Sequence, residues 1–541
     1  MSGPLIVQSD RTVLLETDHP AAEQARHELA IFAELERAPE HIHTYRITRL
    51  GLWNARAAGH DADFIIGSLT QWSKYPLPET VVSEIRSTID RFGKLVISRD
   101  EQGLLLQSQN QAILTEVTTN PKIAELLEGK SGDGFRVRDW ARGQLKQQLL
   151  KLGWPAEDNA GFTPGTPHAI ELKQNGWQIR DYQSKAVEKF AAGGSGVVVL
   201  PCGAGKTLVG AAAMAHFDTN TLILVTNTVA ARQWREELLK RTDLDEKDVA
   251  EYSGSTKQLA PVTIATYQIL TTKKKGEFSH LALLNARDWG LIIYDEVHLL
   301  PAPIFKMTAD LQARRRMGLT ATLVREDGRE SDVFSLIGPK RFDAPWKEIE
   351  AQGYIAPAKC FEIRVSLPDE ERMKYAISDA DARFRIAATA QAKLPILREL
   401  LKRNPTEPTL IIGQYLDQID FVSKELGIPK LTGETPVAER EQLFADFRSG
   451  KLSALVVSKV ANFSVDLPEA SLAIQISGSF GSRQEEAQRL GRLLRPKQDG
   501  RTALFYTLVA RDTVEQDFAQ NRQRFLAEQG YSYEIVNAED F

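Results

Sequence analysis

The fold is decided by residues 197–207, which read VVVLPCGAGKT. Apolar residues 197–200, typical of a buried strand, lead into a glycine-rich loop, and residues 208–217 follow with a helical pattern. This order predicts a phosphate-binding loop, because loop N–H groups and a helix N-terminus face the same anion. The loop residues are Gly203, Ala204, Gly205, Lys206 and Thr207. Lys206 is expected to reach the β- and γ-phosphates, and Thr207 to bind Mg²⁺. The first glycine of the full consensus is replaced by Leu200.

A second strand ends in two carboxylates about ninety residues later, where residues 291–298 read LIIYDEVH. Ligands of α/β sheets bind at the carboxyl ends of the strands, so Asp295 and Glu296 are expected near the phosphate-binding loop. Asp295 would hold Mg²⁺ and Glu296 would polarise the attacking water, as hydrolysis of a phosphoanhydride requires. On its own, such a pair is more often a helix cap.

Arginines recur near the C-terminus, where residues 488–495 read QRLGRLLR. The three-residue spacing of Arg489, Arg492 and Arg495 places them on one face of a helix. Guanidinium groups that reach across a cleft stabilise the transferring phosphate, although the same spacing also suits a solvated basic face. The run Arg314–Arg316 is interpreted as a phosphate contact or as a solvated surface.

Short apolar runs alternate with helical stretches from Trp177 onward, which is typical of parallel sheets covered on both faces. The eight expected strands are residues 196–200, 221–225, 262–265, 291–294, 409–412, 454–457, 472–476 and 503–508. The segment 338–357 separates them into two groups of four. The predicted fold class is therefore α/β, with two tandem RecA-like parallel-sheet lobes and an N-terminal α+β domain.

The predicted boundaries are an N-terminal domain at 1–165, a first lobe at 166–345 and a second lobe at 346–541. The Gly/Pro/Thr-rich segment 161–167 suggests the first boundary. Within the N-terminal region, a helix over 61–72 and a hairpin over 94–106 suggest a winged-helix-like unit. The sequence leaves open whether residues 1–165 form one unit or two.

The amino-acid composition excludes several classes of protein. The 541 residues correspond to three or four domains at roughly 150 residues each. A net charge of −5 argues against binding of nucleic acid through bulk charge, and two cysteines exclude a disulfide framework. No long apolar run or signal-like N-terminus is present, so a cytoplasmic location without membrane contact is expected.

A family resemblance follows from these motifs in order: 180–183 (RDYQ), 203–207, 295–298, 320–322 (TAT) and 488–495. Together they resemble the superfamily 2 helicases of the DExH group. Residues 318–328 (GLTATLVREDG), 334–339 (FSLIGP) and 525–533 (FLAEQGYSY) are similar to the XPB branch, the xeroderma pigmentosum group B helicases. Residues 44–48 and 52–59 resemble the N-terminal domain of that family.

The resemblance implies a helicase or translocase driven by ATP and Mg²⁺ that moves 3′ to 5′ on forked or duplex DNA, in nucleotide excision repair and near the nucleoid. It implies that Gln183, with Arg180 nearby, contacts the adenine. Gln488, Arg492 and Arg495 would complete the catalytic site. The residues implied to touch DNA are Thr228, Arg232, Trp234, Thr266, Tyr267, Arg325, Glu326, Asp327 and Ser458.

Alternatives remain at this stage. RNA-directed DExH motors share the same two ATP-binding lobes. The sequence contains no motif that would distinguish RNA from DNA by its 2′-hydroxyl group. The chain is also compatible with an ATP-gated translocase on double-stranded DNA, or with a scaffold that recruits a repair nuclease. A monomer and a prokaryotic source are expected.

Overall fold

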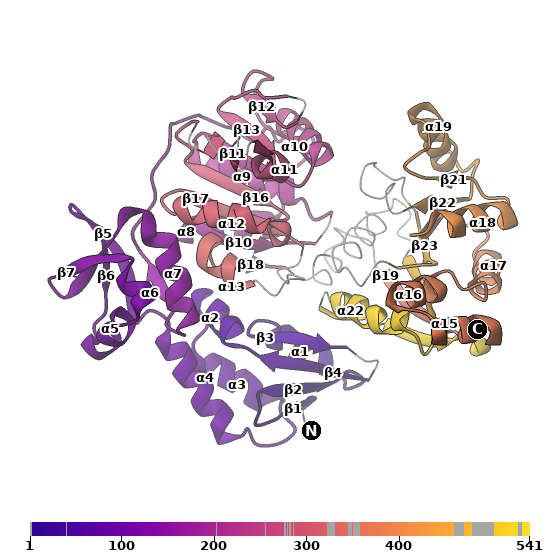
Figure 1. Cartoon of the computed structure of the whole chain (residues 1–541), viewed down its shortest axis with the longest axis horizontal. Helices are drawn as coiled ribbons and strands as arrows, with labels where there is room; N and C mark the ends of the chain where they lie inside the picture. The colour runs from indigo at the N-terminus through magenta and orange to yellow at the C-terminus, as the bar shows by residue number, and fades with distance from the viewer. Residues whose placement is uncertain are drawn as a thin grey trace.

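The chain is described by a computed structural model. The described residues are 3–38, 41–201, 203–254, 256–274, 277–278, 280, 283–284, 286–321, 330–344, 349, 358–458, 470–478, 502–528 and 533–541. Figure 1 shows two N-terminal sheets, one at the left and one at the bottom, with a first lobe above them and a second lobe at the right.

The first lobe is built on a parallel sheet with the strand order β12-β13-β11-β16-β17-β10-β18. Its strands are β10 (Ser195–Val199), β11 (Thr221–Val225), β12 (Val249–Tyr252), β13 (Val262–Thr266), β16 (Leu291–Asp295), β17 (Arg315–Thr320) and β18 (Lys340–Asp343). The four strands predicted for this lobe are all present. The other three, β12, β17 and β18, carry charged residues that hide them from a search for apolar runs.

Helices cover both faces of this sheet. They are α8 (Asp181–Gly193), α9 (Lys206–Phe217), α10 (Thr228–Arg241), α11 (Tyr267–Thr271) and α12 (Ala302–Asp310), with the short η3 (Val297–Leu299), α13 (Glu330–Asp332) and η4 (Val333–Ile337). Along β11, Leu222 and Leu224 pack in the cluster that contains α11 and α12, whereas Ile223 and Val225 pack in the cluster that contains α8, α9 and α10. Strand side chains alternate between faces, so a continuous apolar run serves both cores. Two short strands, β14 (Lys273–Lys274) and β15 (Glu277–Phe278), pair antiparallel with each other.

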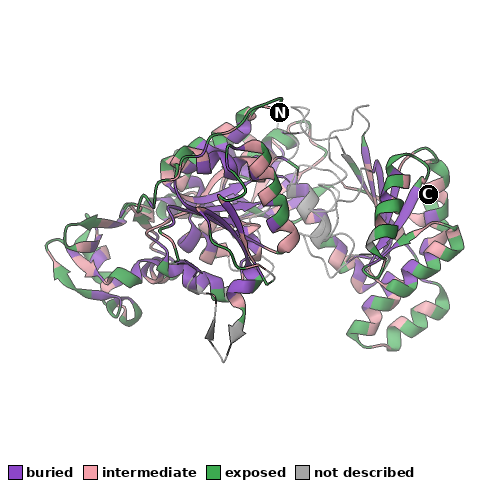
Figure 2. Cartoon of the chain, turned by 90° about the horizontal axis from the view of Figure 1, so that it is seen from above, coloured by how far each residue is buried: buried purple, intermediate pink, exposed green. Residues whose placement is uncertain are grey.

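The second lobe repeats this plan with the strand order β21-β22-β20-β23-β24-β19-β25, again all parallel. Its strands are β19 (Ala358–Val365), β20 (Thr409–Gly413), β21 (Lys430–Leu431), β22 (Ala454–Ser458), β23 (Leu472–Gln475), β24 (Ala503–Ala510) and β25 (Tyr533–Asn537). Its helices are α15 (Asp369–Ile377), α16 (Ala380–Ala388), α17 (Lys393–Arg403), α18 (Leu416–Leu426), α19 (Val437–Arg448), α22 (Val514–Glu528) and η5 (Ala538–Asp540). In Figure 2 the strands of both lobes are buried between helices whose outer faces are exposed. Among the described residues, we find no helix long and apolar enough to cross a bilayer.

The N-terminal region contains two sheets with separate cores. An antiparallel sheet of β1 (Leu5–Val7), β2 (Thr12–Glu16), β4 (Ile42–Ile47) and β3 (Ala33–Arg37) packs with α1 (Ala22–Leu29), α2 (Arg49–Ala57), α3 (Ala62–Trp72) and α4 (Glu79–Arg91). The second sheet has the order β7-β8-β6-β5-β9. Its strands are β5 (Leu95–Asp100), β6 (Gly103–Gln107), β7 (Leu127–Ser131), β8 (Gly134–Val137) and β9 (Ala156–Asp158), with α5 (Gln111–Thr118), α6 (Pro121–Ala124), η1 (Asp139–Ala141) and α7 (Arg142–Lys151).

The expected winged-helix-like unit is therefore not formed as predicted. The helix and the hairpin both exist, and Asp61 caps the helix by accepting from the Phe64 N–H at 2.8 Å. However, α3 packs in the first core and the β5–β6 hairpin in the second. Local patterns identify elements, but they do not say which sheet a helix covers.

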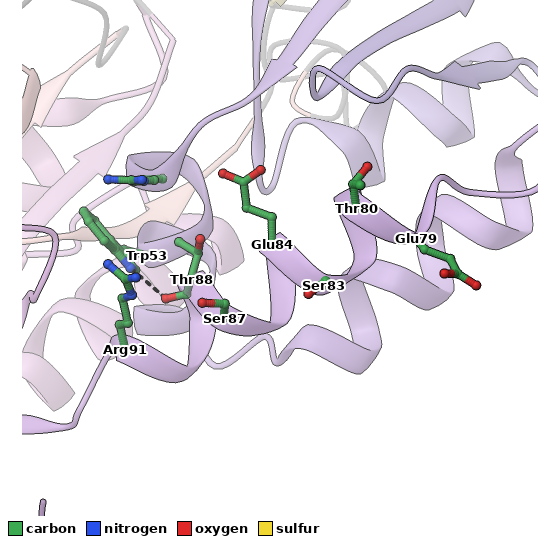
Figure 3. A pocket seen from close by; sticks show the side chains of 9 residues that line it. Trp53, Glu79, Thr80, Ser83, Glu84, Ser87, Thr88 and Arg91 are labelled. Carbon is green, nitrogen blue, oxygen red and sulfur yellow. Dashed lines mark hydrogen bonds between the residues drawn. The ribbon is translucent and has the colours of Figure 1, made fainter.

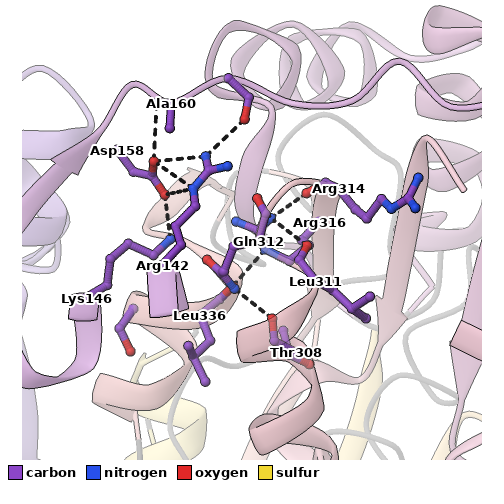
Figure 4. A network of polar contacts seen from close by, with 12 residues as sticks. Arg142, Lys146, Asp158, Ala160, Thr308, Leu311, Gln312, Arg314, Arg316 and Leu336 are labelled. Carbon is purple, nitrogen blue, oxygen red and sulfur yellow. Dashed lines mark hydrogen bonds and ion pairs between the residues drawn. The ribbon is translucent and has the colours of Figure 1, made fainter. Parts of the chain in front are cut away.

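The second N-terminal sheet is joined to the first lobe through a close helix contact and a buried charged cluster. A Cβ added to Gly143 of α7 would lie 2.6 Å from Ala309 of α12, so the two helices approach closely. Beside this contact, Asp158 accepts from Arg142 and Lys146, and Arg316 of β17 donates to backbone carbonyls (Figure 4). Arg316 is fully buried, so it is neither a phosphate contact nor a solvated residue.

Candidate active site

The phosphate-binding loop connects β10 to α9 with two glycines in the left-handed region. Gly203 has φ +82° and Gly205 has φ +81°. A Cβ on Gly205 would also lie 2.4 Å from Nε2 of Gln183, so both conformation and space require glycine there. The loop therefore turns tightly into the N-terminus of α9, where Lys206 and Thr207 begin the helix.

The loop is held from behind by the start of α8. The Tyr182 hydroxyl and the Gln183 amide both donate to the carbonyl oxygen of Ala204, at 2.7 and 2.9 Å. Oε1 of Gln183 accepts from the N–H of Arg180 at 3.0 Å. Gln183 is fully buried and braces the loop, while its contact with adenine stays a prediction. Tyr182 was not singled out from the sequence, although it lies inside the RDYQ motif.

Lys206 and Glu296 form the centre of the site. Nζ of Lys206 lies 2.7 Å from Oε1 of Glu296, and the two side chains are 12% and 17% exposed. Nδ1 of His298 lies 3.5 Å from the other oxygen of Glu296 and 2.7 Å from the Thr320 hydroxyl. Glu296 itself has φ +49°, a left-handed conformation that is costly for a residue with a Cβ and that recurs at functional sites. The structure thus brings the loop lysine, the strand-end carboxylate and the threonine of residues 320–322 together.

Burial alone would raise the pKa of Glu296. The positive charge of Lys206 is the main effect that outweighs it, with help from His298 and the backbone of Ala321, so the pKa of Glu296 is below its ordinary value. For Asp295, burial and the neighbouring Glu296 charge raise the pKa to about 6, against the opposing effect of Lys206.

Asp295 is oriented by two aromatic side chains. Nε1 of Trp234 donates to Oδ2 of Asp295 at 2.8 Å, and the Tyr267 hydroxyl donates to its backbone oxygen at 2.7 Å. The N–H of Glu296 donates to Oδ1 at 3.1 Å. The carboxylate is therefore held on both oxygens.

Four of the expected DNA contacts are buried. Trp234, Thr266, Tyr267 and Ser458 are between 2% and 4% exposed, so their side chains do not lie at the surface, where a nucleic acid would bind. Thr266 instead caps α11 by accepting from the N–H of Ile269 at 3.3 Å.

Two of the remaining expected DNA contacts lie at the start of α10. Thr228 begins α10 half-buried, and Arg232 is exposed, as a DNA contact requires. A residue two positions after Arg232 lies on the opposite side of a helix, which explains why Trp234 turns inward. Three expected contacts, Arg325–Asp327, lie outside the described residues, as do Gln488, Arg492 and Arg495.

The donor set fits ATP and Mg²⁺. The hydroxyl of Thr207 and the carboxylate of Asp295 are the oxygen ligands that Mg²⁺ prefers, and Lys206 provides a charge for phosphate. Gly203 and Gly205, both at positive φ, let the loop turn tightly into the N-terminus of α9, where backbone N–H groups favour an anion. These residues suit a nucleoside triphosphate with its Mg²⁺ ion better than they suit a metal ion alone.

A second concave region, lined by none of the active-site residues, lies between α2 and α4. Its volume is about 560 Å³, and its lining residues are Arg49, Trp53, Glu79, Thr80, Ser83, Glu84, Ser87, Thr88 and Arg91 (Figure 3). Nε1 of Trp53 donates to the Thr88 carbonyl, and Glu84 pairs with Arg11 at 2.9 Å. Because the lining mixes both signs of charge, it does not form a uniform surface for a polyanion.

A phosphate-binding loop after β10, an Asp-Glu pair at the end of β16, which is separated from β10 by β17 alone, and two consecutive parallel sheets define a two-lobed P-loop ATPase of the helicase class. Comparison with known proteins places the chain more narrowly. Residues 349–540 match the family model described as ERCC3/RAD25/XPB C-terminal helicase. Residues 5–130 match Helicase conserved C-terminal domain, and residues 176–325 match Type III restriction enzyme, res subunit.

Two curated relatives span nearly the whole chain. The chain is 63% identical to DNA 3′-5′ helicase XPB of Kineococcus radiotolerans, over 99% of this chain and 97% of that protein. It is 60% identical to DNA 3′-5′ helicase XPB of Mycobacterium tuberculosis, over 99% and 98%. The chain belongs to the XPB helicase family. The solved Hef helicase domain of Pyrococcus furiosus is 16% identical, with a TM-score of 0.46, over 64% of this chain and 98% of that one.

Proposed function

We propose that this chain is an ATP-dependent DNA helicase or translocase that moves 3′ to 5′ and acts in nucleotide excision repair. The observation that carries the proposal is the 2.7 Å contact of Lys206 with Glu296, beside Asp295 at the strand ends. Membership of the XPB family and the names of the two bacterial relatives support DNA as the substrate. Those names give no support to an RNA-directed motor.

The proposed roles follow from the geometry. Lys206, Thr207 and the loop amides would bind the phosphates of ATP, and Thr207 and Asp295 would hold Mg²⁺. When bound, Mg²⁺ neutralises charge on the β- and γ-phosphate oxygens. Glu296 would orient the attacking water and accept its proton. Gln488, Arg492 and Arg495 would complete the site from the second lobe.

The contact between Lys206 and Glu296 bears on this mechanism. Phosphate oxygens compete with Glu296 for the Lys206 ammonium, because both are anionic acceptors. As Lys206 turns to the phosphates, Glu296 loses its partner and becomes available to water. His298, which lies 3.5 Å from the other oxygen of Glu296, would still be beside the carboxylate. Binding of the nucleotide would thereby free Glu296 to activate the water that attacks the γ-phosphate.

We propose the domain limits 1–165, 166–345 and 346–541. The first parallel sheet ends with β18 at Asp343 and the second begins with β19 at Ala358, which supports the second limit. The first limit follows β9, which ends at Asp158.

We also propose that the chain acts as a monomer, recruits a repair nuclease, and works in the cytoplasm at the nucleoid, where its DNA substrate lies. Light scattering of the purified protein tests the monomer. An unwinding assay with and without cell extract separates an autonomous helicase from a motor that needs a partner.

Steady-state ATP hydrolysis tests the main proposal. It is measured for the protein alone and with forked DNA, duplex DNA or single-stranded RNA, with Glu296→Gln as the blank. The expected result is stimulation by DNA well above that by RNA. Greater stimulation by RNA, or none by either polymer, would contradict the proposed substrate.

A further inference from the structure

One helix connects the surface proposed to bind DNA to the interior that orients Asp295. Helix α10 starts at Thr228, and Arg232 on its first turns is exposed. Two residues later Trp234 points inward and donates to Oδ2 of Asp295 at 2.8 Å. A small rotation of α10 therefore moves the hydrogen bond that holds this carboxylate.

The indole of Trp234 also contacts the helix that carries the phosphate-binding lysine. A Cβ added to Gly210 of α9 would lie 2.5 Å from Cη2 of Trp234 and 3.4 Å from Ile293. Glycine at position 210 thus admits the ring between α9 and β16. Trp234 contacts α9, the helix that begins with Lys206, and also the side chain of Asp295. It therefore links the helix that carries the phosphate-binding lysine to the carboxylate.

A second aromatic residue supports the same carboxylate from the next helix. Tyr267 begins α11, directly after β13, and its hydroxyl donates to the backbone oxygen of Asp295 at 2.7 Å. Its side chain is 4% exposed, so DNA bound at the start of α11 acts on Tyr267 only through the backbone.

We propose that Trp234 is a positioning residue that couples DNA bound at α10 to the orientation of Asp295, with Tyr267 as a secondary support. This inference rests on the proposed function, because it assumes that α10 meets DNA. A donor on one carboxylate oxygen selects one orientation of the carboxylate. Coupling between two sites is reciprocal, so DNA and nucleotide must change each other's affinity by the same factor.

Three variants test this role. Trp234→Phe removes the N–H and keeps a ring between α9 and β16. Tyr267→Phe removes one hydroxyl and leaves the fold least disturbed. Trp289→Phe is the matched control, because Trp289 is a fully buried indole of the same lobe whose Nε1 donates to the Leu283 carbonyl at 3.1 Å and does not touch Asp295.

The readout is binding. The Kd of a fluorescent forked DNA is measured by anisotropy with and without Mg²⁺ and the non-hydrolysable analogue AMP-PNP, and the ratio of the two values is the coupling factor. We expect a factor of about 5 or more in the parent protein and in Trp289→Phe. We expect it to fall to about 1 to 2 in Trp234→Phe and to an intermediate value in Tyr267→Phe, while AMP-PNP still binds without DNA.

The outcomes separate the two proposals. If the parent protein binds no DNA or shows a factor of 1, the proposed function fails. If the parent is coupled and Trp234→Phe keeps a factor within twofold of it, the inference is overturned. An equal loss in Trp289→Phe also overturns it, because packing alone then explains the effect. Should Trp234→Phe fail to fold, an unchanged factor in Tyr267→Phe counts against the inference and a reduced one supports it.

Discussion

Removing Asp158 should destabilise the junction between the second N-terminal sheet and the first lobe. Its carboxylate lies 2.9 Å from Nη2 of Arg142 and 2.8 Å from Nζ of Lys146, with Arg316 buried nearby (Figure 4). Both pairing cations are almost fully buried. Burial alone would raise the pKa of Asp158, but Lys146 and Arg142 outweigh it and hold the pKa far below the ordinary value. Asp158→Asn leaves three buried cations without a counter-charge and should cost about 3–5 kcal/mol.

Lys146→Met is expected not to destabilise the protein, in contrast to Asp158→Asn. Burial lowers the pKa of Lys146 from 10.5 to about 8, despite the attraction of Asp158. The ammonium is thus a net burden below pH 8, whereas Arg142 still neutralises Asp158 without it. Replacing it by an apolar side chain of similar length should leave stability unchanged or raise it by about 1–3 kcal/mol at pH 7.

The pH dependence follows from the same shift. Below pH 8, Lys146 is charged in both the folded and unfolded states, and its burial cost is fully present. Between about pH 8 and 10.5 only the unfolded state keeps the proton, so stability rises with pH. The total gain is about 3 kcal/mol at 1.36 kcal/mol per pKa unit. The stability of the parent protein should therefore rise relative to that of Lys146→Met over this range.

Scanning calorimetry between pH 7 and 10 measures these effects, and hydrogen exchange of α7 at pH 7 reports the junction itself, since a protein of several domains does not unfold in one step. Lys151→Met, an exposed lysine on the same helix, is the control and should change stability by less than about 0.5 kcal/mol. The reasoning is refuted if Lys146→Met destabilises the protein at pH 7 as strongly as Asp158→Asn does. A constant difference between parent and Lys146→Met from pH 7 to 10 would also contradict it.

Three further outcomes are expected. Lys206→Ala should lower ATP hydrolysis by about 10²-fold or more, and a normal rate in a colorimetric phosphate assay would overturn the site assignment. Gly205→Ala should weaken binding of a fluorescent ATP analogue by at least about tenfold, because a Cβ at φ +81° is strained by about 1–2 kcal/mol and would collide with Gln183; unchanged affinity would show that the loop adapts. Arg325→Ala should keep DNA-stimulated ATPase and reduce unwinding of a forked duplex, and equal loss of both would remove the proposed role at the fork.

Much of the fold was predictable because continuous apolar runs have few alternatives. The run 221–225 forms a strand with those bounds, and its residues fill the cores on both faces. Strand β17 was harder to place, since it begins with Arg315 and Arg316. Arg316 is buried on a central strand, where the carbonyls of residues 312 and 336 accept hydrogen bonds from its guanidinium group at 2.8 and 2.7 Å. Residue 336 lies 20 positions along the chain, so a local pattern contains no information about that acceptor.

The active site was also predictable from the sequence only in part. The sequence by itself determined the class of chemistry, because Gly203–Thr207 and Asp295–Glu296 follow buried strands, and parallel strands present their ends at one edge. Only the tertiary structure decided which neighbours serve that site. Trp234 and Tyr267 are buried and hold Asp295, and Tyr182 with Gln183 braces the loop. The physical reason is that local spacing sets the face of a helix on which a side chain lies, whereas packing of distant elements decides whether that face meets solvent or a carboxylate.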